Sequence, residues 1–403
     1  MAKDRKKAKT AGKPPAWLWY PAKFFVGLFF RLKYRVKIDN AVLKGHKGPA
    51  VVLATHTSGQ DHILSGMAVP GRPTYVMSQH FFTTPFARRL FAFLHTIPKK
   101  MFCPDSRSVR MIIRAVREGN TVVLFPEGRL TWYSRSLEVT DGTAELVKHL
   151  GVDTYFLLAE GAGKTFPKWS ASGSRRGRIN ISISRLFAAD ELKEMPLGEI
   201  DSKIREAIKH DESLVLPGVR FRSRDTSRGL DGILWVCPIC RAEHTLECKK
   251  GRIFCTSCGA EAALDEYGRI NGLPEECGIN TPGDWYEFCA STIDLDKPYV
   301  ASVAVGAADA EGNMHRDVGL GTLTIDRENI TFEGTLEGEQ VTLSRSTAET
   351  VAFPVSVSDH FDIYFDGRLF LISPLPDKRQ TIIPVAYLDR VTSERRLLAQ
   401  SAD

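Results

Sequence analysis

The sequence predicts an α/β domain, then a small cysteine-containing module, and then a mainly β domain that ends in a helix. Three observations predict this order. Short apolar runs alternate with helical patterns from Ala50 to about Leu186, two C-x-x-C pairs follow, and alternating strands with tight turns begin near Lys297. At 403 residues the chain is too long for one ordinary core, which favours two or three domains.

The chain starts with a basic tail. Its first 13 residues hold six basic side chains against one acidic one, so about +5 of the net charge of +6 lies there (Lys3, Arg5, Lys6, Lys7, Lys9 and Lys13 against Asp4). The rest of the chain is nearly neutral. A short cationic tail is either a solvated end or one part of a membrane-docking segment, and the next residues favour docking.

Residues 16–34, AWLWYPAKFFVGLFFRLKY, predict a helix that begins near Pro21, with Phe24, Leu28 and Leu32 recurring every four residues. The apolar part is shorter than the roughly 20 residues that span a bilayer, and no small-residue cleavage site follows it. We therefore expect an interfacial helix in residues 1–35 that binds the cytoplasmic face of a membrane peripherally. The alternative is a helix packed on its own domain.

The α/β domain is expected over residues 36–220. Apolar runs predict its strands at residues 50–55, 74–79, 121–125, 154–160 and 178–184. Between them, DSRSVRMIIRAVREG predicts a helix with Ser106 as its N-cap and Gly119 just after its end. Strands that alternate with helices on this scale favour a mixed sheet flanked by helices.

A histidine and an aspartate follow the first of these strands. His56 and Asp61 stand five positions apart, which can bring both side chains to one side of a loop or a starting helix. Imidazole accepts a proton near neutral pH, and a carboxylate can fix its tautomer. Taken alone, a histidine and an aspartate at this spacing occur by chance in many chains. His62 is a second candidate for the same role.

A second stretch, TVVLFPEGRLTW, is an apolar strand that breaks at Pro126 and places Glu127, Gly128 and Arg129 at its end. Glycine lets the backbone approach a ligand closely, and arginine can bind a phosphate through two parallel hydrogen bonds. An ordinary strand-to-turn transition with a surface ion pair explains the same residues when they stand alone.

Together, His56-x4-Asp61 and the FPEGRLT block resemble the glycerolipid acyltransferase superfamily, of the lysophosphatidic-acid acyltransferase type, over about residues 17–190. The arginine stands one place earlier than in the commonest E-G-T-R-S form. That order looks like the acyltransferase half of the bifunctional acyl-carrier-protein synthetase/lysophospholipid acyltransferases.

The resemblance implies an α/β acyltransferase domain and a membrane-associated enzyme. It implies that His56 is the general base and Asp61 its orienting group. It also implies an acceptor phosphate site formed by Glu127, Gly128 and Arg129, with charge contributed by Arg107.

The expected reaction moves a fatty acyl group from acyl-CoA or acyl-carrier protein to a lysophospholipid hydroxyl. The expected acceptor is 1-acyl-glycerol-3-phosphate, which gives phosphatidic acid. Remodelling of another lysophospholipid, such as lysophosphatidylethanolamine, is the alternative.

The cysteine module is expected in residues 221–275, after a polar stretch interpreted as a linker. Cys237 and Cys240 form one C-x-x-C pair and Cys255 and Cys258 another, with 14 residues between the pairs. This spacing predicts a zinc ribbon with four thiolate ligands. Four ligands close the coordination shell, so we expect a structural zinc and no catalytic metal. With no secretion signal, a reducing cytosol is expected.

The last part, residues 276–403, predicts strands around the turn DREN, a hairpin with Asp366-Gly367 at its turn, and a closing helix after Pro384. On coarse pattern it resembles a pleckstrin-homology or GRAM-type module.

Zinc ribbons also occur in nucleic-acid-binding proteins, so a non-catalytic scaffold is the hypothesis from another class. Near the ribbon, however, Glu243 and Glu247 offset the basic residues, and the basic stripe of such proteins is absent. We therefore expect no nucleic-acid partner.

Overall fold

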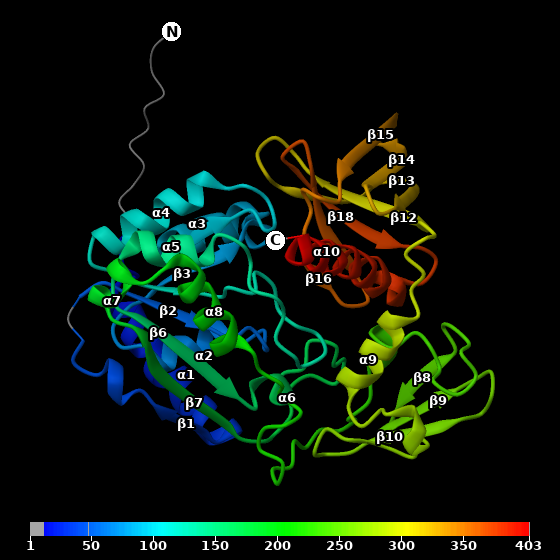
Figure 1. The fold of residues 1–403 in the computed structure, drawn as a ribbon, viewed down its shortest axis with the longest axis horizontal. Helices are drawn as coiled ribbons and strands as arrows, with labels where there is room; N and C mark the ends of the chain where they lie inside the picture. Colours follow the sequence, from blue (N-terminus) through cyan, green and yellow to red (C-terminus); the bar gives the residue numbers. More distant parts are fainter. Residues whose placement is uncertain (1–11, 47, 403) are drawn as a thin grey trace.

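The computed structural model describes residues 12–46 and 48–402. All but Lys13 of the predicted basic tail lies outside these residues. Within the described residues the strands form three sheets, which follow one another along the chain (Figure 1).

The first sheet has the order β1-β7-β6-β2-β5-β3-β4. β7 runs antiparallel to β6, whereas the remaining neighbours are parallel, so the prediction of a mixed sheet is confirmed. All five predicted strands lie in it. Its strands are β1 (Val36–Asp39), β2 (Ala50–Ala54), β3 (Thr74–Ser78), β4 (Ile97–Lys99), β5 (Thr121–Leu124), β6 (Thr154–Glu160) and β7 (Ile179–Phe187).

Helices cover both faces of this sheet. Alternate residues of β2 point to opposite sides. Val52 joins a core with α1 and α2, whereas Leu53 joins a second core with α4, α5 and α8. The helices of this domain are α1 (Ala16–Tyr34), α2 (Asp61–Ala68), α3 (Pro85–Phe93), α4 (Ser106–Arg117), α5 (Thr143–Leu150), α6 (Ala162–Thr165), α7 (Ala189–Glu194) and α8 (Leu197–Ile208).

Two predicted helix starts are wrong. α1 begins at Ala16, and Pro21 lies inside it. α4 is capped by Asp105, whose carboxylate accepts from the backbone N–H of Ser108 at 3.1 Å, rather than by Ser106. Gly119, with φ +80°, follows the end of α4 as predicted.

α1 has two different sides. Phe30 and Tyr34 are buried against Phe166, so the helix packs on its own domain. The predicted apolar line faces outward, with Phe24 65% and Leu32 75% exposed. Among the described residues, no helix is both long enough and apolar enough to cross a membrane.

The second sheet is antiparallel, with the order β11-β10-β9-β8. Its strands are β8 (Leu246–Lys249), β9 (Arg252–Cys255), β10 (Glu261–Leu264) and β11 (Ile270–Asn271). The preceding stretch, interpreted as a linker, is packed in place, because Phe221 and Leu230 are fully buried. The predicted domain boundaries stay predictions.

The third sheet, here called the C-terminal sheet, is antiparallel with the order β15-β14-β13-β12-β18-β17-β16. α9 (Pro282–Ser291) precedes it and α10 (Ile382–Ala402) closes it. The predicted DREN turn joins β13 to β14, and Asp366-Gly367 joins β17 to β18. The strands are β12 (Tyr299–Ala308), β13 (Met314–Ile325), β14 (Asn329–Leu336), β15 (Glu339–Ser346), β16 (Val355–Ser356), β17 (His360–Phe365) and β18 (Arg368–Pro374).

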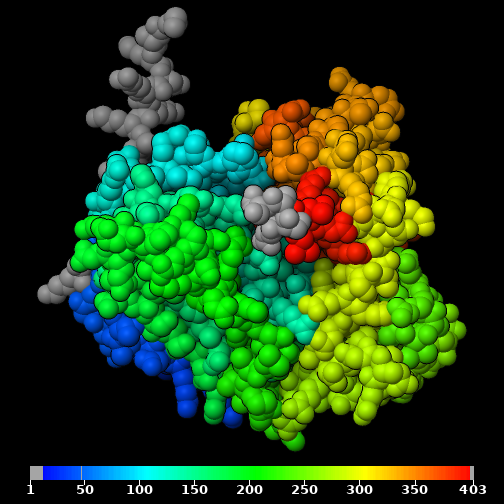
Figure 2. Space-filling view, in the orientation of Figure 1, coloured from blue at the N-terminus to red at the C-terminus, as the bar shows by residue number. Residues whose placement is uncertain are grey.

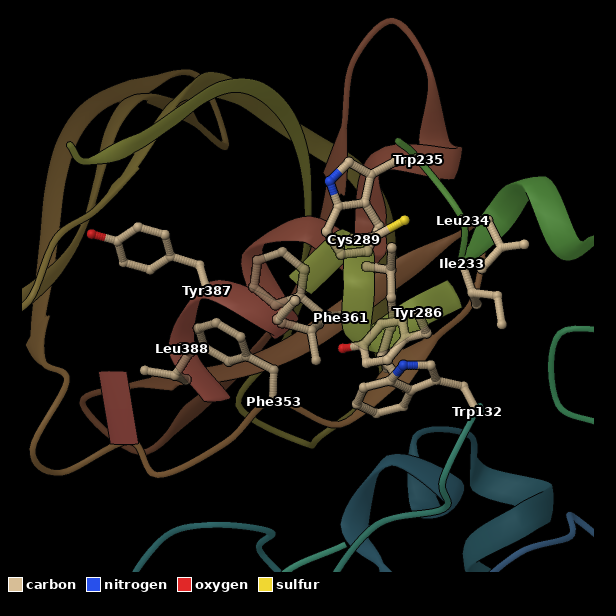
Figure 3. Packing of buried hydrophobic residues seen from close by; sticks show 14 of the residues in the cluster. Trp132, Ile233, Leu234, Trp235, Tyr286, Cys289, Phe353, Phe361, Tyr387 and Leu388 are labelled. Carbon is tan, nitrogen blue, oxygen red and sulfur yellow. The ribbon is translucent and has the colours of Figure 1, made fainter. Parts of the chain in front are cut away.

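The α/β domain and the C-terminal sheet share a core. Trp132, from the segment after β5, is 1% exposed and belongs to the same apolar cluster as Phe353, Phe361 and Tyr387 of the C-terminal part. Its ring meets Tyr286 of α9 edge-on at 5.8 Å (Figure 3). On the surface, α10 lies between the two parts (Figure 2). The segment after β5, which carries Glu127, Arg129 and Trp132, is therefore packed against the C-terminal part of the chain as well as joined to the first sheet.

Candidate active site

His56 and Asp61 form a hydrogen-bonded dyad where β2 ends. The chain leaves β2 at Ala54, turns through a short loop, and starts α2 at Asp61. His56 Nδ1 lies 2.9 Å from Asp61 Oδ2, and the backbone N–H of Ser58 donates to the same oxygen at 2.9 Å. The carboxylate therefore assigns the proton to Nδ1. Nε2 is left with its lone pair, as a base requires.

Burial keeps His56 neutral. It lowers the pKa of His56 to about 3, and the positive charge of Lys168 lowers it further. At neutral pH the imidazole can thus accept a proton. Its ring stacks on Phe125 with centroids 4.4 Å apart, which holds its plane.

His62 also lines the cavity, but no hydrogen bond joins it to a carboxylate among the described residues. The geometry favours His56 over His62 as the base. The catalytic assignment of His56 and Asp61 stays a prediction.

Glu127 is buried behind the dyad. One carboxylate oxygen accepts from the backbone N–H of His56 at 2.6 Å, and the other accepts from that of Leu137 at 2.7 Å. Burial raises the pKa of Glu127 to about 7, which these two N–H groups oppose. These are the contacts of a positioning residue for the His56 loop. That Glu127 also forms part of an acceptor phosphate site stays a prediction.

Gly128 shapes the same turn. Its φ is +73°, and a Cβ there would meet Thr140 Cγ2 at 3.0 Å, so the turn requires glycine.

Arg129 is held by the C-terminal part of the chain. Its guanidinium donates to Asp389 of α10 at 2.6 Å and to the Phe353 carbonyl at 3.0 Å. The same group lies 4.8 Å from the Trp132 ring. The charge predicted to bind phosphate is therefore already paired. Arg107 is exposed on α4 and does not line the cavity, so the structure does not bring it to the other predicted site residues.

One cavity of about 1460 Å³ opens in front of the dyad. His56 and Arg129 line it together. Much of the wall is apolar, from β3, α4 and the segment before α4 (Val76, Met77, Met101, Phe102, Ile112 and Ile113). The opposite wall comes from the C-terminal part (Arg345, Val351, Val355 and Asp362 among others). A cavity of this size and lining can hold an acyl chain beside a polar headgroup.

Lys168 is a cavity residue that the sequence analysis missed. It lies three residues after α6, in an irregular segment with no motif. Burial and the charge of Arg129 lower its pKa to about 8, whereas the charge of Asp362 opposes this shift. Among the described residues it has no ion pair or hydrogen bond, so its ammonium group is available to an anion in the cavity.

The four cysteines of the two pairs meet at one end of the second sheet. Cys237 Sγ lies 3.8 Å from Cys258 Sγ, and Cys240 Sγ lies 3.8 Å from Cys255 Sγ. All four sulfur atoms lie within 4.8 Å of one another. A tetrahedron with metal–sulfur bonds of about 2.3 Å has edges of about 3.8 Å, so the set fits a Zn²⁺ ion.

Comparison with known proteins identifies the first domain. Residues 34–157 match the family model described as Acyltransferase. Among solved structures, the 1-acyl-sn-glycerophosphate (LPA) acyltransferase PlsC from Thermotoga maritima is similar at 16% identity and a TM-score of 0.41. The match covers 52% of this chain and 83% of that one. The stretch that matches the acyltransferase model, residues 34–157, contains both the His56–Asp61 dyad and the Glu127–Arg129 turn.

Proposed function

We propose that the protein transfers a fatty acyl group from acyl-CoA or acyl-carrier protein to the hydroxyl of a lysophospholipid. The acceptor we propose is 1-acyl-glycerol-3-phosphate, which gives phosphatidic acid. The observation that carries the proposal is the partly buried His56–Asp61 dyad, which opens into a large, mostly apolar cavity within an acyltransferase domain.

The dyad supplies the base for a direct transfer. His56 Nε2 takes the proton of the acceptor hydroxyl as the oxygen attacks the thioester carbonyl carbon. The tetrahedral intermediate then breaks its C–S bond, and the departing thiolate takes the proton back from the imidazolium. The ester forms, the thiol is released, and His56 returns to its starting state. Asp61 holds Nδ1–H throughout, so Nε2 remains the reacting atom.

Lys168 is the cation that we assign to the acceptor phosphate. Its ammonium feels the charge of Asp362 but makes no ion pair at contact distance among the described residues, whereas Arg129 is paired with Asp389 at 2.6 Å. An unpaired cation in a partly buried cavity is stabilised by an anionic ligand. Arg129 adds its hydrogen-bond donors only where the substrate phosphate competes with Asp389.

The exposed side of α1 supports membrane docking. Trp17, Phe24, Phe25 and Leu32 are each more than 60% exposed, although they are large apolar residues. Such a helix lies in the interface between headgroups and acyl chains, from which a lysolipid can enter the cavity. We assign it to the cytoplasmic face, whose anionic lipids attract a basic tail.

We also propose that Cys237, Cys240, Cys255 and Cys258 bind one structural zinc ion. All four ligand positions would be filled by sulfur, so this ion would hold the module together without entering the reaction.

The test is an acyl-transfer assay on the purified chain with vesicles. Labelled acyl-CoA and acyl-carrier protein are offered against lysophosphatidic acid and lysophosphatidylethanolamine. The second acceptor is included because Glu145 and Glu349 line the cavity and could pair with its ammonium group. We expect labelled phosphatidic acid from the wild type.

His56→Gln should form no product, and His149→Gln should retain activity, since His149 lines the same cavity but lies on α5. Absence of product with every pair, or full activity of His56→Gln, would refute the proposal.

A further inference from the structure

Two histidines and an aspartate meet where the α/β domain faces the C-terminal sheet. His80 lies in the short 3-10 helix Gln79–Phe82 that follows β3. His360 and Asp362 lie on β17, two positions apart and thus on one face of the strand. His80 Nδ1 is 3.2 Å from Asp362 Oδ2, and His360 Nε2 is 3.6 Å from Asp362 Oδ1. One ligand atom from each residue lies within 4.8 Å of the other two.

The two nitrogen atoms that face Asp362 lie at ion-pair distance from its carboxylate but make no well-aligned hydrogen bond to it among the described residues. His80 Nδ1 and His360 Nε2 are both buried, and neither makes a hydrogen bond of proper geometry among the described residues. A buried polar atom without a hydrogen-bond partner destabilises the folded chain. An ion pair between a protonated His80 and Asp362 would satisfy His80 Nδ1. It would leave His360 Nε2 without a partner among the described residues.

A further carboxylate sets the tautomer of His360. Asp359 Oδ2 lies 2.9 Å from His360 Nδ1, so the proton belongs on Nδ1 and the lone pair on Nε2, toward Asp362. A carboxylate behind a histidine is the usual support of a metal-binding imidazole.

Among the described residues, Asp362 makes ion-pair contacts only with the two histidines. The neighbouring Asp359 is paired with Arg316 at 3.3 Å and with Lys378 at 3.4 Å. Lys168 lies on the cavity side, where its charge acts on both His80 and His56. An anion bound in the cavity would offset that positive charge.

We propose that His80, His360 and Asp362 bind one divalent metal ion, with Zn²⁺ as the best match to two imidazoles and one carboxylate. Three protein ligands leave a fourth position open. His80 and Asp362 line the cavity, so this position faces the substrates, and water or a phosphate oxygen would fill it. The expectation of a single, purely structural metal would then be revised.

The site would also join two parts of the chain. Its ligands come from the 3-10 helix after β3 and from β17, so one ion would fix the C-terminal wall of the cavity against the acyltransferase domain. The proposal goes beyond the acyl-transfer assignment and does not depend on it.

Metal content of the full-length protein tests the site. After loading with zinc and desalting, we expect two zinc ions per chain by elemental analysis, one for each cluster. His80→Gln and Asp362→Asn should each retain one. The matched control is His315→Gln, which removes another histidine–aspartate pair of the C-terminal part, 3.0 Å from Asp309, and should retain two.

A cobalt(II) titration of the wild type answers the question even if a variant fails to fold. The cysteine set should give intense sulfur charge-transfer bands, and a second phase should give weaker bands without them. This second phase should persist in the Cys240→Ser protein and vanish in His80→Gln. A titration with only the sulfur signature, or equal zinc content in His80→Gln and the wild type, would overturn the proposal.

Discussion

The two walls of the cavity hold their polar groups in different ways. On the acyltransferase wall, His56 is held by partners close in sequence, Asp61 and Ser58, and from behind by Glu127. On the facing wall, polar groups are held by contacts between residues far apart in the sequence. The ion pair between Arg129 and Asp389 of α10 is an example.

This difference suggests separate roles for the two walls, the first in the acyl-transfer step and the second in binding the acceptor. The dyad is complete within one domain, so the base role proposed for His56 does not require the C-terminal sheet. The facing wall determines which cation is already paired, because Asp389 binds Arg129 whereas Lys168 has no ion pair at contact distance in the part of the chain that the structure describes. Changes on the first wall should therefore lower turnover, whereas changes on the second should alter acceptor binding.

The largest effect is expected for Asp61→Asn. The amide no longer fixes the proton on His56 Nδ1, so part of the imidazole adopts the wrong tautomer. We expect kcat to fall by about 10²–10⁴, the usual contribution of a positioned base, with KM for the acceptor nearly unchanged. Steady-state kinetics on vesicles measures both. A large rise in KM with unaltered kcat would show that the dyad binds substrate instead.

Trp132→Ala should weaken the packing between the acyltransferase domain and the C-terminal part of the chain. The ring is 1% exposed in the core shared with α9 and the C-terminal sheet. Truncating a buried tryptophan costs about 3–5 kcal/mol. Urea unfolding should show this loss, whereas Trp17→Ala, at a position 72% exposed, should change stability by less than about 0.5 kcal/mol. Similar, small losses in both variants would mean that the C-terminal part is only loosely attached.

The first wall could be predicted from the sequence because its determinants are local. Short continuous apolar runs predicted the strands, and His56 and Asp61 are close enough in sequence for one loop to join them. The cysteine spacing likewise brings four sulfur atoms together across a short antiparallel sheet.

The second wall could not be predicted, because its contacts depend on how distant segments fold together. Asp389 is 260 positions from Arg129, and no pattern near either residue indicates the pair. Lys168 lies in an irregular segment, so neither periodicity nor a motif marks it. The misplaced N-cap of α4 is a smaller case, since Ser106 and Asp105 are adjacent and equally suitable by residue type.

Lys168→Met should raise KM for a phosphorylated acceptor by about tenfold to a hundredfold, since a hydrogen bond to a charged group contributes about 1.5–3 kcal/mol. kcat should change little. Lys99→Met is the matched control, because Lys99 also lines the cavity and its pKa is likewise lowered by burial. An equal rise in both variants would remove Lys168 from its assigned role.

The same lysine predicts a pH dependence. Because burial lowers the pKa of Lys168 to about 8, its ammonium is present below that pH and is lost as the pH rises through it. The acceptor phosphate is already largely dianionic above pH ~6. KM for the phosphorylated acceptor should therefore rise between pH 7 and pH 9 (about one unit on each side of that pKa). Lys168→Arg, which stays charged, should flatten the profile. A rise that persists in Lys168→Arg would point to another group.

The smallest effect is expected for Asp389→Asn, which keeps the shape of the Arg129 contact but removes its negative charge. An unpaired guanidinium should then attract the acceptor phosphate, lowering KM by about threefold, in line with the roughly 0.2–1 kcal/mol of a partly exposed ion pair. An acceptor without a phosphate should show no change, which serves as the control. A higher KM would reverse the assignment. Asp389 would then orient Arg129 toward the substrate instead of competing for it, and the facing wall would contribute directly to the phosphate site.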